Sequence, residues 1–148
     1  LTHPFLEKLD EETIYNELYY DKRNIEEIFD SEVIGMAYPY GTYDDRVIKI
    51  ARDLGIRYAR TAGTSMNFSV DGDLMKYKGT CHFSNTEIFN LIDKFDALPE
   101  SEERQVLYIW GHTYEFDVLK KWGLLSEILE RLKSVKAEFV TNRDAFGL

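Results

Sequence analysis

The chain has 148 residues, a hydrophobic fraction of 44% and a net charge of −9 at pH 7, which is enough apolar material for one folded domain with a core. Lysine and arginine are scattered and form no basic stripe, so nucleic acid and anionic membrane are poor partner predictions. A single cysteine, Cys81, excludes an intramolecular disulfide, and no apolar stretch suits a membrane span.

The first predicted elements are a helix, a strand and a turn. Residues 10–29 carry apolar side chains at helical spacing behind an acidic first turn, which predicts an amphipathic helix. Residues 33–38 are a short apolar run typical of a buried strand. The sequence Pro39-Tyr40-Gly41 that follows predicts a turn.

A second helix and strand follow, and then a long loop. Thr42 is expected to cap the helix, with Asp45 three residues later as its reciprocal partner, and Gly55 is expected to end it. Residues 57–60 are the next predicted strand. Residues 61–83 have no helical period, so they predict a long loop with one or two short strands, and a loop of this length in a compact domain is often functional.

The rest of the chain continues the alternation of helices and strands. Residues 84–87 have the pattern of a capping box that opens a helix. Residues 106–110 predict a strand, and apolar residues spaced along 118–132 predict a helix that is broken near Gly123. Residues 137–140 are the final predicted strand.

Apolar strands that alternate with amphipathic helices predict an α/β fold with a parallel sheet. Ligands in such folds lie at the carboxyl ends of the strands. Two of the predicted strands end there in Tyr38-Pro39-Tyr40-Gly41 and in Trp110-Gly111-His112. His3 is expected on the same rim, because residues 1–4 resemble the tail of a preceding strand. We therefore expect polar and aromatic residues from separate strands to converge on one cleft.

His112 is the strongest single candidate for chemistry. A histidine at the tip of a strand can be a general acid or base, a metal ligand or a polar core residue. Gly111 permits close approach of backbone or ligand, Trp110 offers a flat apolar wall, and Glu115 can orient the imidazole. These neighbours favour a functional role and do not name a reaction.

The histidines show no recognised metal-binding spacing. A catalytic zinc-type site needs about three protein ligands, and the chain offers His3, His82 and His112 outside any known metal motif. Cys81 and His82 are adjacent, so they cannot point the same way on a strand. This favours a buried cysteine beside a half-exposed histidine.

Five segments occur in a distinctive order along nearly the whole chain. They are LTHP (1–4), GMAYPYGTY (35–43), IRYART (56–61), TCH (80–82) and YIWGHTYEF (108–116). Together they resemble a NodB-type polysaccharide deacetylase, carbohydrate esterase family 4, and Thr141-Asn142 fits the same group.

The resemblance implies a distorted (β/α) barrel and a divalent metal, such as zinc, cobalt or nickel, held by one Asp and two His. His3 matches the second histidine of the pair and would be a metal ligand. Tyr40 would contribute its backbone N–H to an oxyanion hole, and His112 would be the general acid that protonates the leaving amine. The implied reaction is hydrolysis of N-acetyl, or sometimes O-acetyl, groups on a polysaccharide or oligosaccharide.

The same resemblance makes five further residues candidates for binding the substrate. They are Tyr38, Pro39, Trp110, His82 and Glu115. The chain also departs from the family pattern, because the first motif, with its Asp base and Asp ligand, and the first histidine of the pair are absent. Ala37 replaces the usual Arg ahead of Pro-Tyr, and the usual Asp/Trp motif is not evident, so TCH is the segment that could occupy its place near the cleft.

We therefore expect residues 1–148 to form a single domain, the C-terminal part of a deacetylase catalytic domain whose first strands would lie upstream of Leu1. Its incomplete sheet would have an open edge that permits self-association, and the chain alone is expected to have negligible activity. Two alternatives stay open: a non-catalytic carbohydrate-binding or assembly module on the same fold, and an unrelated open α/β domain. The compartment is equally open between a bacterial cytoplasm and the envelope or exterior.

Overall fold

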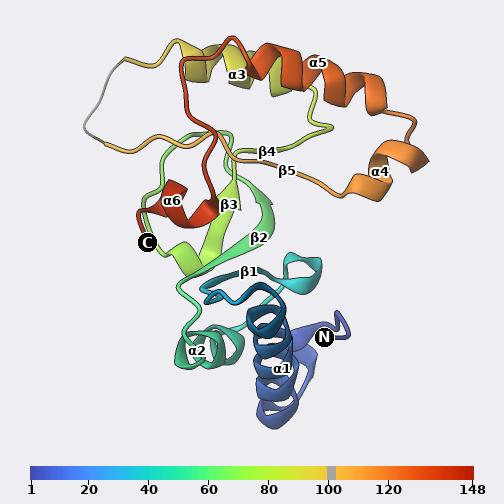
Figure 1. The fold of residues 1–148 in the computed structure, drawn as a ribbon, viewed down its shortest axis with the longest axis vertical. Coiled ribbons are helices and arrows are strands. Elements are labelled where there is room, and N and C mark those ends of the chain that lie inside the picture. Colours follow the sequence, from blue (N-terminus) through green and yellow to red (C-terminus); the bar gives the residue numbers. More distant parts are fainter. Residues whose placement is uncertain (100–102) are drawn as a thin grey trace. The chain divides into compact units, whose positions relative to one another are not determined.

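The computed structural model describes residues 1–99 and 103–148 (Figure 1). The chain divides into two compact units, which are described separately. Unit 1 comprises Leu1–Gly63, Asp71–Lys78 and Asn142–Leu148, and unit 2 comprises Thr64–Val70 and Gly79–Thr141. The prediction that residues 1–148 form a single domain stays a prediction.

Unit 1 combines helices with a small sheet. Its helices are α1 (Glu11–Phe29), α2 (Asp45–Asp53) and the short α6 (Asn142–Phe146), with 3-10 turns at Leu6–Lys8, Pro39–Gly41 and Leu74–Lys76. Its sheet has the order β1 (Gly35–Ala37), β2 (Tyr58–Thr64), β3 (Tyr77–Gly79). Strands β1 and β2 run parallel, with Gly35 opposite Tyr58 and Ala37 opposite Arg60.

The core of unit 1 forms between the two long helices and the sheet. Ile14 of α1, Val47 and Ala51 of α2, and Ala59 of β2 are all fully buried in one apolar cluster. Val47 and Ala51 are four residues apart, so they share one face of α2. Burying a side chain as large as Ile14 contributes about 1.5–3 kcal/mol to the stability of the fold. The two helices are therefore stabilised by this shared core.

Asp44 caps α2, and the predicted pair of Thr42 and Asp45 does not. The carboxylate of Asp44 accepts a hydrogen bond from the backbone N–H of Val47 at 2.9 Å. The hydroxyl of Thr42 instead donates to Glu7 at 2.9 Å. The predicted capping box is wrong because α2 begins two residues later than Thr42 would require.

Unit 2 contains a second parallel pair of strands and an apolar helical layer. Its described elements are β4 (Cys81–His82), α3 (Ile88–Asp96), β5 (Ile109–Trp110), α4 (Thr113–Val118) and α5 (Trp122–Leu132). Strands β4 and β5 are parallel, with Cys81 opposite Ile109 and His82 opposite Trp110. Helices α3 and α5 lie side by side (Figure 1), and Ile92 and Ile128 from the two helices share one buried cluster.

One predicted helix start in unit 2 is wrong, and the next predicted helix is divided as expected. Residues 84–87 do not form a capping box, because α3 begins at Ile88 and the side chain of Asn85 accepts a bond from the N–H of Glu87 in the preceding turn. The helix predicted across 118–132 is divided into α4 and α5, with Lys120 between them at a φ of 53°.

The strand predicted over residues 137–140 is absent from the structure. Phe139 is 75% exposed and residues 137–140 are assigned to no strand, since an apolar run alone does not provide a pairing partner. The helix break predicted near Gly123 is confirmed, because α4 ends at Val118 and α5 begins at Trp122, one residue before Gly123.

The α/β class with parallel strand pairing is confirmed, because both parallel pairs occur between helices along the chain. The described strands form sheets of three and two strands, and the predicted barrel and self-association through a sheet edge stay predictions. None of the helices in the described residues is both long and apolar enough to traverse a bilayer.

The cap of α2 gives a direct test of the local structure. We expect Asp44→Ala to destabilise the helix by about 0.5–2 kcal/mol, because the N–H of Val47 loses its acceptor. Asp45→Ala is the matched control, since the side chain of Asp45 is fully exposed. Hydrogen exchange at the Val47 amide should accelerate in the first variant and stay near wild type in the second, and the reverse order would contradict the assignment.

Candidate functional site

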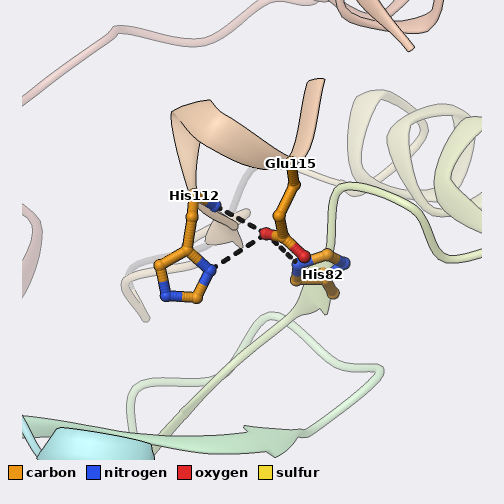
Figure 2. A group of neighbouring side chains, drawn as sticks. All are labelled: His82, His112 and Glu115. Carbon is orange, nitrogen blue, oxygen red and sulfur yellow. Dashed lines mark hydrogen bonds and ion pairs between the residues drawn. The ribbon is translucent and has the colours of Figure 1, made fainter. Parts of the chain in front are cut away.

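Three side chains at the ends of β4 and β5 form a compact polar cluster in unit 2 (Figure 2). His82 is the last residue of β4, His112 follows the end of β5, and Glu115 lies in the first turn of α4. Because the two strands are parallel, with His82 opposite Trp110, their carboxyl ends meet at one edge of the sheet. The strand pairing thus brings together side chains that are distant along the chain.

Gly111 allows the chain to turn from β5 into α4 directly beside β4. A Cβ atom at this position would lie 2.3 Å from Cδ1 of Phe83 and 3.4 Å from Nε2 of His82. Phe83 is buried in the core, and its N–H donates to the carbonyl of Trp110 at 2.8 Å. The ring therefore has little room to withdraw, and the close approach requires glycine.

One oxygen of Glu115 accepts hydrogen bonds from both histidines. Oε2 accepts from the backbone N–H of His112 at 2.8 Å and from its Nδ1 at 2.9 Å, and Nε2 of His82 lies 3.1 Å away (Figure 2). Glu115 is the third residue of α4, where a carboxylate satisfies free backbone N–H groups at the start of a helix. The helix start fixes the carboxylate, and the carboxylate orients both rings.

The partners of the ring nitrogens define where the protons lie. An ionised carboxylate can only accept, so Nδ1 of His112 and Nε2 of His82 carry the protons that they donate to Glu115. Nδ1 of His82 lies 3.3 Å from the backbone nitrogen of Ser84 and 2.8 Å from its hydroxyl oxygen. In the neutral form of His112, the lone pair is on Nε2, the nitrogen that points away from Glu115.

Glu115 is held in its ionised form. Burial raises its pKa, but hydrogen bonds from the side chain and backbone of His112 and from His82 lower it by more, so the pKa lies below its usual value. The side chain is half-buried. A carboxylate in this position orients the two imidazoles and stabilises a positive charge that develops on either ring.

Aromatic rings surround the two histidines. His82 meets Trp110 edge-on, with ring centroids 4.6 Å apart, and His112 lies 5.3 Å from the ring of Tyr114. The side chains of His112 and Tyr114 are exposed. Flat, exposed rings beside a polar group are suited to contact with a sugar face.

Cys81 precedes His82 and takes no part in the cluster. Its side chain is fully buried, and burial raises the pKa of its thiol to about 11. The thiol is therefore protonated and inert at neutral pH. The expected arrangement of a buried cysteine beside a half-exposed histidine is confirmed.

A second group of predicted site residues lies in unit 1, where His3 is beside Tyr40. Their ring centroids are 4.8 Å apart in an edge-to-face contact, and Phe5 stacks on Tyr40 at 4.0 Å. His3 and Tyr40 both have positive φ, 58° and 57°, a conformation that is uncommon outside glycine. His3 and Pro39 also line one cavity of about 310 Å³. The predicted site residues His3 and Tyr40 therefore lie in contact within unit 1.

The predicted residues consequently fall into two groups, one in each unit. The predicted common cleft and the role of each residue stay predictions.

Tyr38 is only 3% exposed, and its hydroxyl donates to the carbonyl of Met75 at 2.9 Å. It therefore packs in the core, where burial raises the pKa of its hydroxyl.

Sequence reasoning missed the partner of His82. Ser84 was assigned to a helix cap, yet its hydroxyl lies 2.8 Å from Nδ1 of His82. The available signal was the spacing of two residues, at which a serine after a strand can bond back to the chain.

The ligand-type side chains favour a different set of metal ligands from the one that the resemblance implies. Among the residues that the structure describes, the His, Cys, Asp and Glu side chains whose ligand atoms gather in a group of three are His82, His112 and Glu115, within 4.8 Å of one another. His3 lies outside that group. The described surroundings of His3 therefore do not complete the implied set of one Asp and two His.

Comparisons with known proteins give the family context. Residues 1–59 match the family model for polysaccharide deacetylase. A solved structure of the Streptococcus pyogenes deacetylase PplD in complex with acetate is similar at 26% sequence identity and a TM-score of 0.43. The match covers 44% of this chain and 29% of PplD, and none of the curated proteins matches the chain.

The resemblance to a polysaccharide deacetylase is thus confirmed for a partial region, residues 1–59. That region contains His3 and Tyr40. His82, His112 and Glu115 lie beyond the matched residues.

Gly111 provides a stability test of the cluster. We expect Gly111→Ala to destabilise unit 2 by about 1–3 kcal/mol, because the added methyl group overlaps the buried ring of Phe83. Gly123→Ala is the matched control, since nothing lies within 4 Å of its added Cβ and alanine favours α5 by up to about 1 kcal/mol. Both tryptophans of the chain lie in unit 2, so their fluorescence during urea denaturation measures both effects. Equal stability of the two variants would contradict the close approach at Gly111.

Proposed function

We propose that the chain takes part in the metal-dependent hydrolysis of N-acetyl or O-acetyl groups on a polysaccharide or oligosaccharide, with His112 as the general acid. The match of residues 1–59 to the polysaccharide deacetylase family supports the reaction class. The observation that carries the role of His112 is the 2.9 Å contact of its Nδ1 with Glu115. The (β/α) barrel of this family is part of the same proposal.

His112 is suited to transfer a proton at Nε2. Its Nδ1 is committed to Glu115, and its side chain is exposed, so Nε2 is the nitrogen that a substrate can reach. When Nε2 carries a proton, the ionised Glu115 stabilises the imidazolium. Giving that proton to the leaving nitrogen or oxygen as its bond to the acetyl carbon breaks avoids a strongly basic leaving group, an effect worth about 10²–10⁴-fold in rate.

The backbone N–H of Tyr40 is proposed as a donor to the oxyanion of the tetrahedral intermediate. The turn that holds Tyr40 is fixed by two hydrogen bonds, from Gly41 N–H to the Tyr38 carbonyl at 2.9 Å and from Thr42 N–H to the Pro39 carbonyl at 3.3 Å. A donor in a rigid turn needs little reorganisation during the reaction, and one such donor is worth about 2.7–4 kcal/mol.

The metal of the proposed reaction is zinc, cobalt or nickel, and His3 is the residue assigned to hold it. Such an ion, when bound, acts as a Lewis acid on the acetyl carbonyl and lowers the pKa of bound water. The described residues around His3 do not complete a group of three ligands. We therefore propose negligible deacetylation by the 148-residue chain on its own.

A non-catalytic carbohydrate-binding module is the second candidate. Tyr40 and Tyr114 are 55% and 62% exposed, and exposed tyrosine rings can stack on sugars without any reaction. This alternative predicts binding of acetylated oligosaccharides that does not depend on His112.

Acetate release from N-acetylglucosamine oligomers with added Zn²⁺, Co²⁺ or Ni²⁺ tests the proposed function. The assay uses the 148-residue chain and, where the natural protein continues before Leu1, the longer protein. We expect negligible release by the short chain, and release by the longer protein that falls about 10²–10⁴-fold in His112→Ala. Asp45→Ala, whose side chain is fully exposed, is the control and should retain activity.

Two results would contradict the proposal. Metal-dependent release by the short chain would contradict its inactivity, and undiminished release by His112→Ala would remove the assigned general acid. Oligomer binding without acetate release by the longer protein would favour the carbohydrate-binding module.

A further inference from the structure

We propose that His82, His112 and Glu115 form a binding site for one divalent transition-metal ion of the zinc class, with a ligand set that does not include His3. The ligand atoms are Nε2 of His82, Nδ1 of His112 and Oε2 of Glu115, which all lie within 4.8 Å of one another (Figure 2). The site lies wholly within unit 2.

Two of the three pairs of ligand atoms have a spacing close to what zinc requires, and the third pair, the two imidazole nitrogens, lies within 4.8 Å. Zinc bonds to nitrogen and oxygen are about 2.0–2.2 Å long, so neighbouring ligands of a tetrahedral ion are about 3.3–3.6 Å apart. Oε2 of Glu115 lies 3.1 Å from Nε2 of His82 and 2.9 Å from Nδ1 of His112. An ion that replaces the two shared protons would have to spread these pairs by only a few tenths of an ångström.

Each ring can move its proton to the nitrogen that does not bind the metal. Nδ1 of His82 lies 2.8 Å from the hydroxyl oxygen of Ser84, which can accept from a protonated Nδ1. The 3.3 Å bond that this nitrogen accepts from the backbone N–H of Ser84 is then lost. Nε2 of His112 belongs to an exposed side chain and can donate to water. Ser84 is therefore a positioning residue for His82, of the kind that commonly supports a metal-binding histidine.

The ligand types select the class of metal. Two imidazoles and one carboxylate suit zinc and its transition-metal neighbours, whereas magnesium and calcium prefer sites made of oxygen atoms. Three protein ligands leave a fourth position for water or another small ligand.

The inference does not rest on the proposed deacetylation. It shares His112 with that proposal, but metal binding is measured without substrate and on the 148-residue chain. A chain that binds zinc and releases no acetate supports this site whatever becomes of the proposed reaction.

Calorimetric titration of Zn²⁺ into the tag-free, chelator-treated chain tests the site. We expect one equivalent to bind, and binding to be lost in His112→Ala and in Glu115→Gln. Asp45→Ala is the control, because it removes a fully exposed carboxylate outside the cluster and should leave binding unchanged. Ser84→Ala should weaken binding by about 10-fold or more, and Mg²⁺ should not replace Zn²⁺.

Circular dichroism establishes that each variant is folded. Because the side chain of His112 is exposed, we expect His112→Ala to disturb folding less than Glu115→Gln. Substitution with Co²⁺ should give the visible absorption of a tetrahedral site without thiolate bands, since Cys81 is buried. Absence of zinc binding by the wild-type chain would overturn the proposal. So would unchanged binding in folded His112→Ala and Glu115→Gln, or its loss in Asp45→Ala.

Discussion

One carboxylate oxygen, Oε2 of Glu115, joins segments of the chain that are 33 residues apart. It accepts from His82 at the end of β4 and from both the backbone and the ring of His112 ahead of α4. Two features make this possible: the parallel register of β4 and β5, and the absence of a side chain at Gly111, where a Cβ would strike Phe83. The orientation of both imidazoles, and with it any chemistry at this edge of the sheet, follows from that one acceptor.

His82, His112 and Glu115 carry two proposed roles, proton transfer and metal binding. The two roles cannot occur together, because both use Nδ1 of His112. While Nδ1 of His112 donates to Glu115, its Nε2 is available to exchange a proton with a substrate. When Nδ1 binds a metal, the carboxylate becomes a fellow ligand and Nε2 carries the proton. Metal binding at this cluster would therefore change which ring nitrogen of His112 carries the proton. The proposed metal site and the proposed general acid thus depend on the same imidazole.

Local patterns of sequence predicted part of this structure. The helix α1 and the contact of Glu115 with His112 involve residues three or four apart, so spacing alone predicted both. Spacing did not predict burial along α1, because Ile14 is fully buried while Ile28 and Phe29 are 74% and 71% exposed. The contact between His82 and Glu115 depends on the pairing of β4 with β5, which spacing does not encode. The cap at Asp44 was missed because several neighbouring residues can cap a helix, and the strand expected at 137–140 failed because an apolar run does not specify a pairing partner.

The tautomers of the two histidines test the central claim most directly. Nitrogen-15 correlation spectra of the metal-free chain, recorded at a pH where both rings are neutral, distinguish protonated from unprotonated ring nitrogens. The shared acceptor predicts a proton on Nδ1 of His112 and on Nε2 of His82, with the His112 preference weakened in Glu115→Gln. A wild-type His112 protonated only at Nε2, or spectra unchanged by Glu115→Gln, would contradict the shared carboxylate.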